Sequence, residues 1–249
     1  MQSASRLILN PHILNMRNNL ILGGVLALAA TVPAHGADFF DTSAAGSLID
    51  LGVRLGVNTT NRNLNKEVFN VWNHNSWGTG VNVGAVVNMN FRNYLTIQPG
   101  IFYQSRSGQY AYVNIDGYDS DGVAEYMMQY GKDRSYNFTI PVMCCIHFNL
   151  SDDIRWDVEA GPYLQLKLKS SVNGDFSYPV YDNPMANPEA YIPIEARKTD
   201  FGMKFGTGLR ILNHYLVAVH YEAGWLHPWK DSRLGGRNKG WIFSLGYDF

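Results

Sequence analysis

The stretch RWDVEAGPYLQLKLK, residues 155–169, alternates apolar and polar side chains with a period of two. One face of this stretch would carry, in an extended chain, Trp156, Val158, Ala160, Leu164, Leu166 and Leu168. The other face would carry Arg155, Asp157, Glu159, Gly161, Gln165, Lys167 and Lys169. Successive side chains of a β-strand point to opposite faces of the sheet, so this pattern predicts a strand with an apolar side and a polar side.

Seven further segments show the same alternation, which predicts an all-β protein with eight strands. In chain order the eight segments are 49–58, 81–91, 95–104, 136–149, 155–169, 200–211, 214–225 and 240–249. Pro99, Pro141 and Pro162 lie inside three of them. Since proline has no backbone N–H to donate to a neighbouring strand, we expect β-bulges or bends beside these three positions.

Two architectures fit such strands, a soluble sandwich and a membrane barrel. A sandwich buries its apolar faces against each other, whereas a barrel turns them to lipid and encloses the polar ones. Segments of about 9 to 13 residues are long enough to cross a bilayer when tilted. The connections also alternate between short (92–94, 150–153 and 212–214) and long (60–78, 105–133, 170–197 and 226–239). Short periplasmic turns and long extracellular loops are typical of outer-membrane barrels.

The aromatic residues support the barrel. With both termini in the periplasm, the residues expected at the lower edge are Phe91, Tyr94, Phe148, Trp156, Tyr215 and Phe249. Those expected at the upper edge are Trp77, Tyr103, Tyr136, Phe138, Phe201, Trp225 and Trp241. Two aromatic girdles around an aliphatic band are characteristic of membrane barrels. The sequence therefore predicts an eight-stranded, antiparallel, up-and-down transmembrane β-barrel.

Composition narrows the function classes. The formal charge of the 249 residues is −1, which argues against an electrostatic nucleic-acid binder. An apolar fraction of 46% excludes wholesale disorder. The two cysteines, Cys144 and Cys145, are adjacent and predict neither a disulfide framework nor a zinc site. Cys144 is expected to face lipid and Cys145 the barrel interior.

The first 36 residues have the features of an export signal. Arg17 precedes an uncharged run from Leu20 to Ala34, and small residues follow it at 34–37. A basic region, an apolar run and a small-residue cleavage site define a secretory signal. We therefore expect 1–36 to be a signal peptide and 37–249 the barrel domain. Met16 is an alternative start, which would make 1–15 a non-native extension.

The chain resembles outer-membrane β-barrel proteins of the porin-family, PorT-like type found in Bacteroidota. The resemblance rests on residues 51–56, 138–142, 160–163, 205–209 and 245–249, and it spans nearly all of the expected mature chain. It implies insertion by the outer-membrane assembly machinery, with the last strand as the sorting signal. It transfers no catalytic residues.

The polar faces carry charges of both signs into the expected interior. They are Asp50, Arg54, Asp157, Glu159, Lys167, Asp200, Lys204, Arg210 and Glu222. Such a set could line an ion pathway or form a cross-paired plug, and we favour the plug because a buried charge requires a partner. A turn at 212–214 would place Lys204 opposite Glu222, and His220 opposite Gly206.

No motif predicts catalysis, so we expect no enzymatic activity, no catalytic residue, no cofactor and no metal site. His220 and Glu222 point inward, and His227 and Asp231 at the rim belong to no recognisable arrangement. His147 is expected to be a hydrogen-bonded interior residue. The acidic run Asp116–Gly122 could ligate Ca²⁺, but its spacing departs from the EF-hand loop and favours a solvated turn.

The long loops are the expected place of function. Tyr110, Tyr112, Tyr126 and Tyr130 in the second long loop form either a recognition surface or strand extensions above the membrane. We expect a monomer in the cell outer membrane whose partners are membrane lipid, the assembly machinery and a surface or secretion partner, with no nucleic acid. It would act as a membrane scaffold or surface-interaction protein. The alternatives are a narrow pore or secretion accessory, and a lipid-modifying enzyme.

Export gives the first test. N-terminal sequencing of the protein purified from outer membranes should begin near Ala37, because the small-residue site follows the apolar run there. A mature protein that retains residues 20–30 would contradict a cleaved signal.

Overall fold

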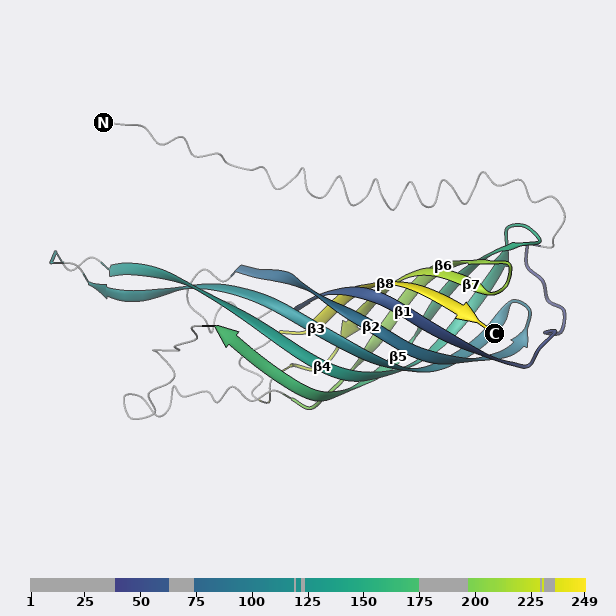
Figure 1. Cartoon of the computed structure of the whole chain (residues 1–249), viewed down its shortest axis with the longest axis horizontal. Coiled ribbons are helices and arrows are strands. Elements are labelled where there is room, and N and C mark those ends of the chain that lie inside the picture. Colours follow the sequence, from purple (N-terminus) through teal and green to yellow (C-terminus); the bar gives the residue numbers. More distant parts are fainter. Residues whose placement is uncertain are drawn as a thin grey trace, which may run out of the picture.

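The computed structural model describes residues 39–62, 74–118, 120–121, 124–174, 197–228, 230 and 236–249. It is a single sheet of eight antiparallel strands in which each strand pairs with its sequence neighbour and β1 pairs with β8, so the sheet closes into a barrel (Figure 1). The strands are β1 (Ile49–Arg62), β2 (His74–Arg92), β3 (Leu95–Tyr118), β4 (Ala124–Asn149), β5 (Ile154–Gly174), β6 (Thr199–Ile211), β7 (Tyr215–Gly224) and β8 (Asn238–Asp248). The predicted fold is confirmed.

The alternation in the sequence becomes the inside and the outside of this barrel. In β1 the side chains of Val53 and Leu55 are 47% and 63% exposed, whereas Arg54 between them is 4% exposed. A soluble protein would have the opposite arrangement, because apolar side chains gain stability by leaving water. An apolar outer wall around polar residues suits a lipid surrounding and excludes the sandwich.

The three short connections lie at the end of the barrel that holds the C-terminus (Figure 1). Between β6 and β7, Leu212 and Asn213 have φ angles of 52° and 61°. This left-handed conformation suits a tight hairpin, and Asn adopts it at little cost, whereas Leu does so rarely. Ile211 pairs with Tyr215 across the turn, as expected.

The second long loop is shorter than predicted. Residues 105–133 were expected to be a loop, but β3 and β4 continue as a hairpin as far as the pair Tyr118–Ala124 (Figure 1). The prediction was wrong because it took the thickness of the membrane as the limit of strand length, although this segment contains five tyrosines, a residue that favours strands. The tyrosines at 110, 112, 126 and 130 therefore lie in strand extensions.

The same correction changes the interpretation of the acidic run. Its first residues, Asp116 to Tyr118, belong to β3, and Ser120 and Asp121 form a turn. Positions 119 and 122 lie outside the described residues. No group of three His, Cys, Asp or Glu side chains in the described part of the chain could hold a metal ion.

In each aromatic girdle, residues predicted to belong to it pack against one another. At the lower edge Phe148 packs on Trp156 with ring centroids 5.2 Å apart, and at the upper edge Phe201 packs on Trp225 at 5.1 Å. The segment before β1 adds Phe39, whose ring lies 5.2 Å from that of Phe148. The lower girdle thus extends to the chain that leads into the first strand.

The pairing is interrupted beside the three prolines, as expected, but without a bulge. Next to Pro99 and Pro141 the ladder lacks two residue pairs, and the register is the same on both sides of each gap. Pro162 lies in such a gap on the β4 side, whereas on the β6 side it pairs with Met203 in a continuous register. A proline removes one donor without adding a residue, so the ladder weakens without shifting. The register shifts between described strands lie elsewhere, at 77–82, 90–92, 115–117 and 136–137.

Several expectations fall outside the described residues. These are the signal peptide with its cleavage site, and Asp231 at the rim. In the part of the chain that is described, no helix has the length and apolar character needed to cross a membrane.

Closure of the barrel can be tested at its last residue. The Phe249 amide donates to the Leu51 carbonyl at 2.9 Å, and its ring packs edge-on against Tyr247. Phe249→Ala should lower the yield of folded protein in the membrane several-fold, because the last strand must dock on the first and an open edge in lipid leaves backbone groups unpaired.

The matched control is Phe91→Ala, which removes another exposed aromatic from the lower girdle but lies away from the closing seam. Heat-modifiable migration and membrane yield measure both variants. An equal loss in the two would show that girdle aromatics matter in general, and that the last residue has no special role.

Candidate functional site

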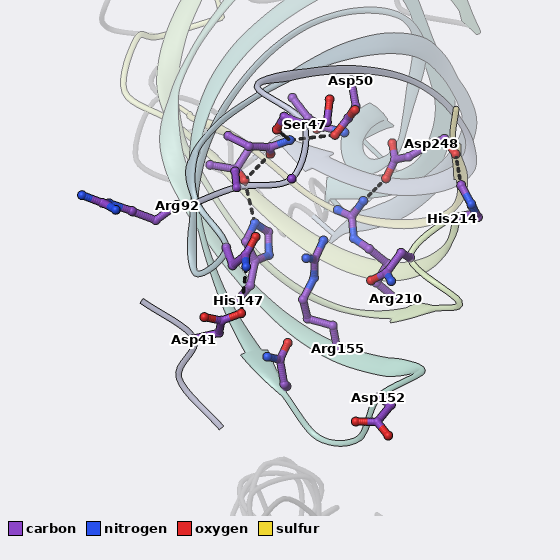
Figure 2. A pocket seen from close by; sticks show the side chains of 18 of the residues that line it. Asp41, Ser47, Asp50, Arg92, His147, Asp152, Arg155, Arg210, His214 and Asp248 are labelled. Carbon is purple, nitrogen blue, oxygen red and sulfur yellow. Dashed lines mark hydrogen bonds and ion pairs between the residues drawn. The ribbon is translucent and has the colours of Figure 1, made fainter. Parts of the chain in front are cut away.

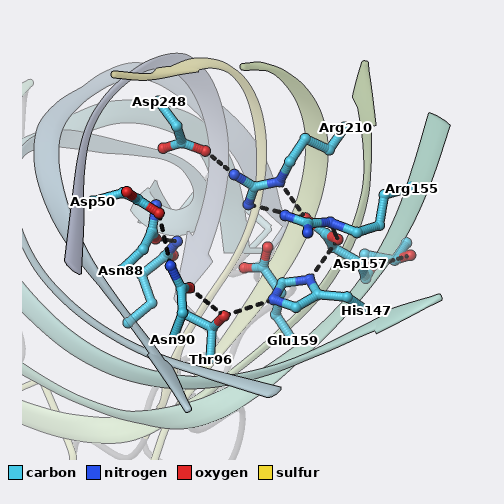
Figure 3. Close-up of polar contacts among 12 residues, drawn as sticks. Asp50, Asn88, Asn90, Thr96, His147, Arg155, Asp157, Glu159, Arg210 and Asp248 are labelled. Atoms are coloured by element: carbon cyan, nitrogen blue, oxygen red, sulfur yellow. Dashed lines mark hydrogen bonds and ion pairs between the residues drawn. The ribbon is translucent and has the colours of Figure 1, made fainter. Parts of the chain in front are cut away.

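The interior of the barrel is filled by charged side chains that pair with one another in layers. The layer nearest the periplasmic end is centred on Asp157 of β5, which is completely buried. Its carboxylate lies 3.0 Å from Nη2 of Arg210, 2.6 Å from Nδ1 of His147 and 3.6 Å from Nε of Arg155 (Figure 3). Three strands, β4, β5 and β6, therefore meet on one carboxylate.

Hydrogen bonds hold the His147 ring on both sides, as expected for an interior residue. The Asn90 side-chain amide donates to Asp50 at 2.7 Å and to a backbone carbonyl, so its oxygen faces Thr96. The Thr96 hydroxyl donates to that oxygen at 2.7 Å and lies 2.8 Å from Nε2 of His147. The Asp157 carboxylate lies 2.6 Å from Nδ1, so both ring nitrogens have a partner.

A second carboxylate extends this layer to the closing seam. Asp248 of β8 pairs with Arg210 of β6 and, at 2.8 Å, with Nη1 of Arg54 of β1 (Figure 3). All three side chains are about 4% exposed. An ion pair therefore links the first and last strands inside the barrel, where the low dielectric strengthens the attraction between opposite charges.

The middle of the barrel is closed by a further pair. Nε2 of His220 lies 2.8 Å from the carboxylate of Glu159. Gly206 faces His220 across β6 and β7, as predicted, and a Cβ at position 206 would lie 2.1 Å from the ring. The glycine thus makes room for the imidazole. The cavity found at this level has a volume of about 20 Å³, which leaves room for only about one water molecule.

The upper layer contains the predicted pair and one residue that the sequence analysis missed. Lys204 pairs with Glu222 in the ladder, and Nζ lies 3.7 Å from Oε1. Arg106 makes the closer ion pair with the same carboxylate, and Gln104 donates to it at 3.3 Å. Arg106 was missed because it was assigned to a loop. The strand-forming residues beyond position 104 were the signal that would have placed it in the interior.

The remaining residues singled out in the sequence differ in their partners and in their exposure. The side-chain amides of Asn90 and Asn238 donate to Asp50 and Asp200 at 2.7 and 2.8 Å, and among the described residues neither carboxylate forms an ion pair. Cys144 is exposed on the outer wall and Cys145 is buried inside, as expected. At the rim, Nδ1 of His227 lies 3.1 Å from the Gly236 carbonyl oxygen.

The periplasmic end opens into a polar pocket of about 510 Å³ (Figure 2). Arg155, Arg210 and His147 line its inner part, where the Asp157 layer closes it. The segment before β1 crosses the mouth, where Asp41 accepts from Asn93 at 2.7 Å. Hydrogen bonds from Ser43, and then from Asn93, lower the pKa of the Asp41 carboxyl. The pocket ends at paired charges, so the arrangement is that of a plug and not of an open ion pathway.

Comparisons with known proteins agree with this architecture. A family model described as "Outer membrane protein beta-barrel domain" matches residues 39–225. No curated protein matches the chain in sequence. Among solved structures, OprG from Pseudomonas aeruginosa is 9% identical with a TM-score of 0.42, over 86% of this chain and 99% of that one.

Two other structures are similar at the same level. Neisserial surface protein A is 11% identical with a TM-score of 0.40, over 80% of this chain and 95% of that one. Ail of Yersinia pestis, in complex with the heparin analogue sucrose octasulfate, is 10% identical with a TM-score of 0.38, over 82% and 100%.

The upper layer gives a stability test. Glu222→Gln leaves Arg106 and Lys204 buried without their carboxylate, which should lower the free energy of unfolding by roughly 3–5 kcal/mol. Lys204→Met should cost much less, because Glu222 keeps Arg106. Adding Arg106→Met to Glu222→Gln should recover more stability than adding Lys204→Met, because the closer pair then disappears as a whole. Urea unfolding in lipid vesicles measures these differences. If Arg106→Met and Lys204→Met recover the same stability when each is added to Glu222→Gln, Arg106 is not the main partner of Glu222.

Proposed function

The chain belongs to the outer membrane protein beta-barrel domain family, and from this premise we propose that it is a non-catalytic surface-interaction protein acting through the β3–β4 hairpin. The barrel is the part that holds it in the outer membrane. The hairpin is the part that would meet a partner.

The backbone pairing of the hairpin carries this proposal. The β2–β3 ladder reaches only as far as His74–Ala111, and the β4–β5 ladder only as far as Gly131–Gly174. Beyond those points, residues 112–118 and 124–130 pair with each other and with no other described strand (Figure 1). Within the described part of the chain, the backbone N–H and C=O groups on both edges of this ribbon have no strand partner, and such edges can bind an extended segment of another chain by β-augmentation.

The resemblance to PorT-like proteins supports a narrower version of the proposal. A barrel of that type would serve as an accessory of a secretion apparatus, and another component of the apparatus would bind the hairpin. Export by a signal peptide at 1–36, insertion by the outer-membrane assembly machinery and a monomeric barrel belong to the same proposal. The paired interior argues against the alternative of a narrow pore.

Conductance and cross-linking test the proposal together. The purified protein in a planar bilayer should give no stable open channel, because the middle of the barrel leaves about 20 Å³. A photo-cross-linking amino acid at position 113, in the ribbon, should give a discrete adduct on intact cells. The same amino acid at Lys198, which precedes β6, is the control and should give none. A stable channel, or equal adducts at both positions, would contradict a surface-interaction role for the hairpin.

A further inference from the structure

The outer wall of the barrel has a groove of about 770 Å³ near its extracellular end, across β1 to β4 and β8. Its lower row consists of Phe243, Val57, Val81, Ser105 and Tyr136, which follow one another across the wall. Phe243 and Tyr136 are the large side chains at the two sides. The small side chains between them leave the groove hollow.

A second row above the first is polar. Thr59 pairs with Thr79, and Ser107 pairs with Arg134. Arg134 is exposed and lines the groove, and Tyr103 packs on Tyr136 beside it with ring centroids 6.2 Å apart. The groove is therefore apolar toward the middle of the membrane, bears hydroxyl groups higher up, and ends at a cation.

An irregular seam between β2 and β3 produces this hollow. The register shifts by one residue between Trp77 and Asn82, and the ladder is interrupted. Side chains replace the missing bonds: the Val81 amide donates to Oγ of Ser105 at 2.9 Å, and Oγ of Ser107 donates to the Thr79 carbonyl at 2.7 Å. The hydroxyl groups hold the wall together without filling its outer surface.

The inner side of the seam explains why the wall is thin there. Asn58 and Thr60 reach across β2 and donate to the Ser105 and Ser107 carbonyls at 2.9 and 2.8 Å. These two side chains pass over Gly80 and Gly78. A Cβ at Gly80 would lie 2.0 Å from the Ser105 carbonyl oxygen, and a Cβ at Gly78 would lie 2.3 Å from that of Ser107. Glycine at both positions is therefore required for these hydrogen bonds.

We propose that this groove binds one phosphate-bearing lipid of the outer leaflet. The groove faces the membrane, so lipid is the molecule that can enter it from the side. An acyl chain fits along Val57, Val81 and Phe243, and the polar linkage region of the lipid meets the hydroxyl of Thr79. Arg134 then pairs with the phosphate, for which a guanidinium is well suited. This site does not depend on the function proposed for the hairpin.

Lipid binding by the purified full chain tests the proposal, with native mass spectrometry in detergent as the readout. The probes are dioleoyl phosphatidic acid and dioleoylglycerol, which share their acyl chains and differ in the phosphate. One phosphatidic acid should bind per protein, and dioleoylglycerol should bind at least roughly tenfold more weakly, because it lacks the charge-assisted hydrogen bonds. Equal binding of the two lipids would overturn phosphate recognition.

Two variants locate the site. Arg134→Gln should weaken phosphatidic acid about tenfold or more, with little change for dioleoylglycerol. Thr79→Phe should fill the groove and weaken both lipids strongly, whereas Thr79→Val, which removes only the hydroxyl group, should weaken both lipids by less. Heat-modifiable migration verifies that each variant is folded. Unchanged phosphatidic acid binding in folded Arg134→Gln and Thr79→Phe would overturn the site.

A cation elsewhere on the protein serves as the control. Lys198 is exposed before β6, away from the groove. Lys198→Gln should leave phosphatidic acid binding unchanged. A loss equal to that of Arg134→Gln would show general attraction to positive charge, and competition by inorganic phosphate alone would show that the acyl chains are not recognised. Either result would overturn a lipid site.

Discussion

Closure of the sheet is the constraint on which the rest of this structure depends. A strand edge exposed to lipid leaves backbone N–H and C=O groups without partners, and each such group costs several kcal/mol. The pairing of β1 with β8 removes both edges. Once the sheet is closed and its apolar face meets lipid, every polar side chain on the other face is enclosed, and those side chains must satisfy one another.

The charged layers follow from that enclosure. Asp157, Asp248 and Glu222 each form ion pairs with two basic side chains, and the two partners of each come from different strands. A carboxylate shared in this way ties together strands that are not neighbours in the sheet. The Arg54–Asp248–Arg210 contact joins β1, β8 and β6, so the interior supports the same seam that the backbone closes. The function proposed for the protein therefore lies outside the plug, on the hairpin and on the outer wall.

The wall departs from regular pairing where it has the proposed lipid groove. Regular strands with large aliphatic residues give a smooth surface, as along most of the barrel. Between β2 and β3 a shift of one residue, two inward glycines and a set of hydroxyl groups replace part of the ladder. Side-chain hydrogen bonds then satisfy the Val81 amide and the Thr79, Ser105 and Ser107 carbonyls, and the irregular seam forms a hollow on the side that faces lipid.

The sequence by itself determined the eight strands, the faces they turn to lipid and the short turns, because period two and turn residues are local properties. It also predicted Lys204 opposite Glu222, since one turn sets the register of one hairpin. It did not place Arg106 of β3 beside Glu222 of β7, or Asp248 of β8 beside Arg210 of β6. Those contacts join strands far apart in the sequence, and only the curvature and closure of the barrel bring such side chains together.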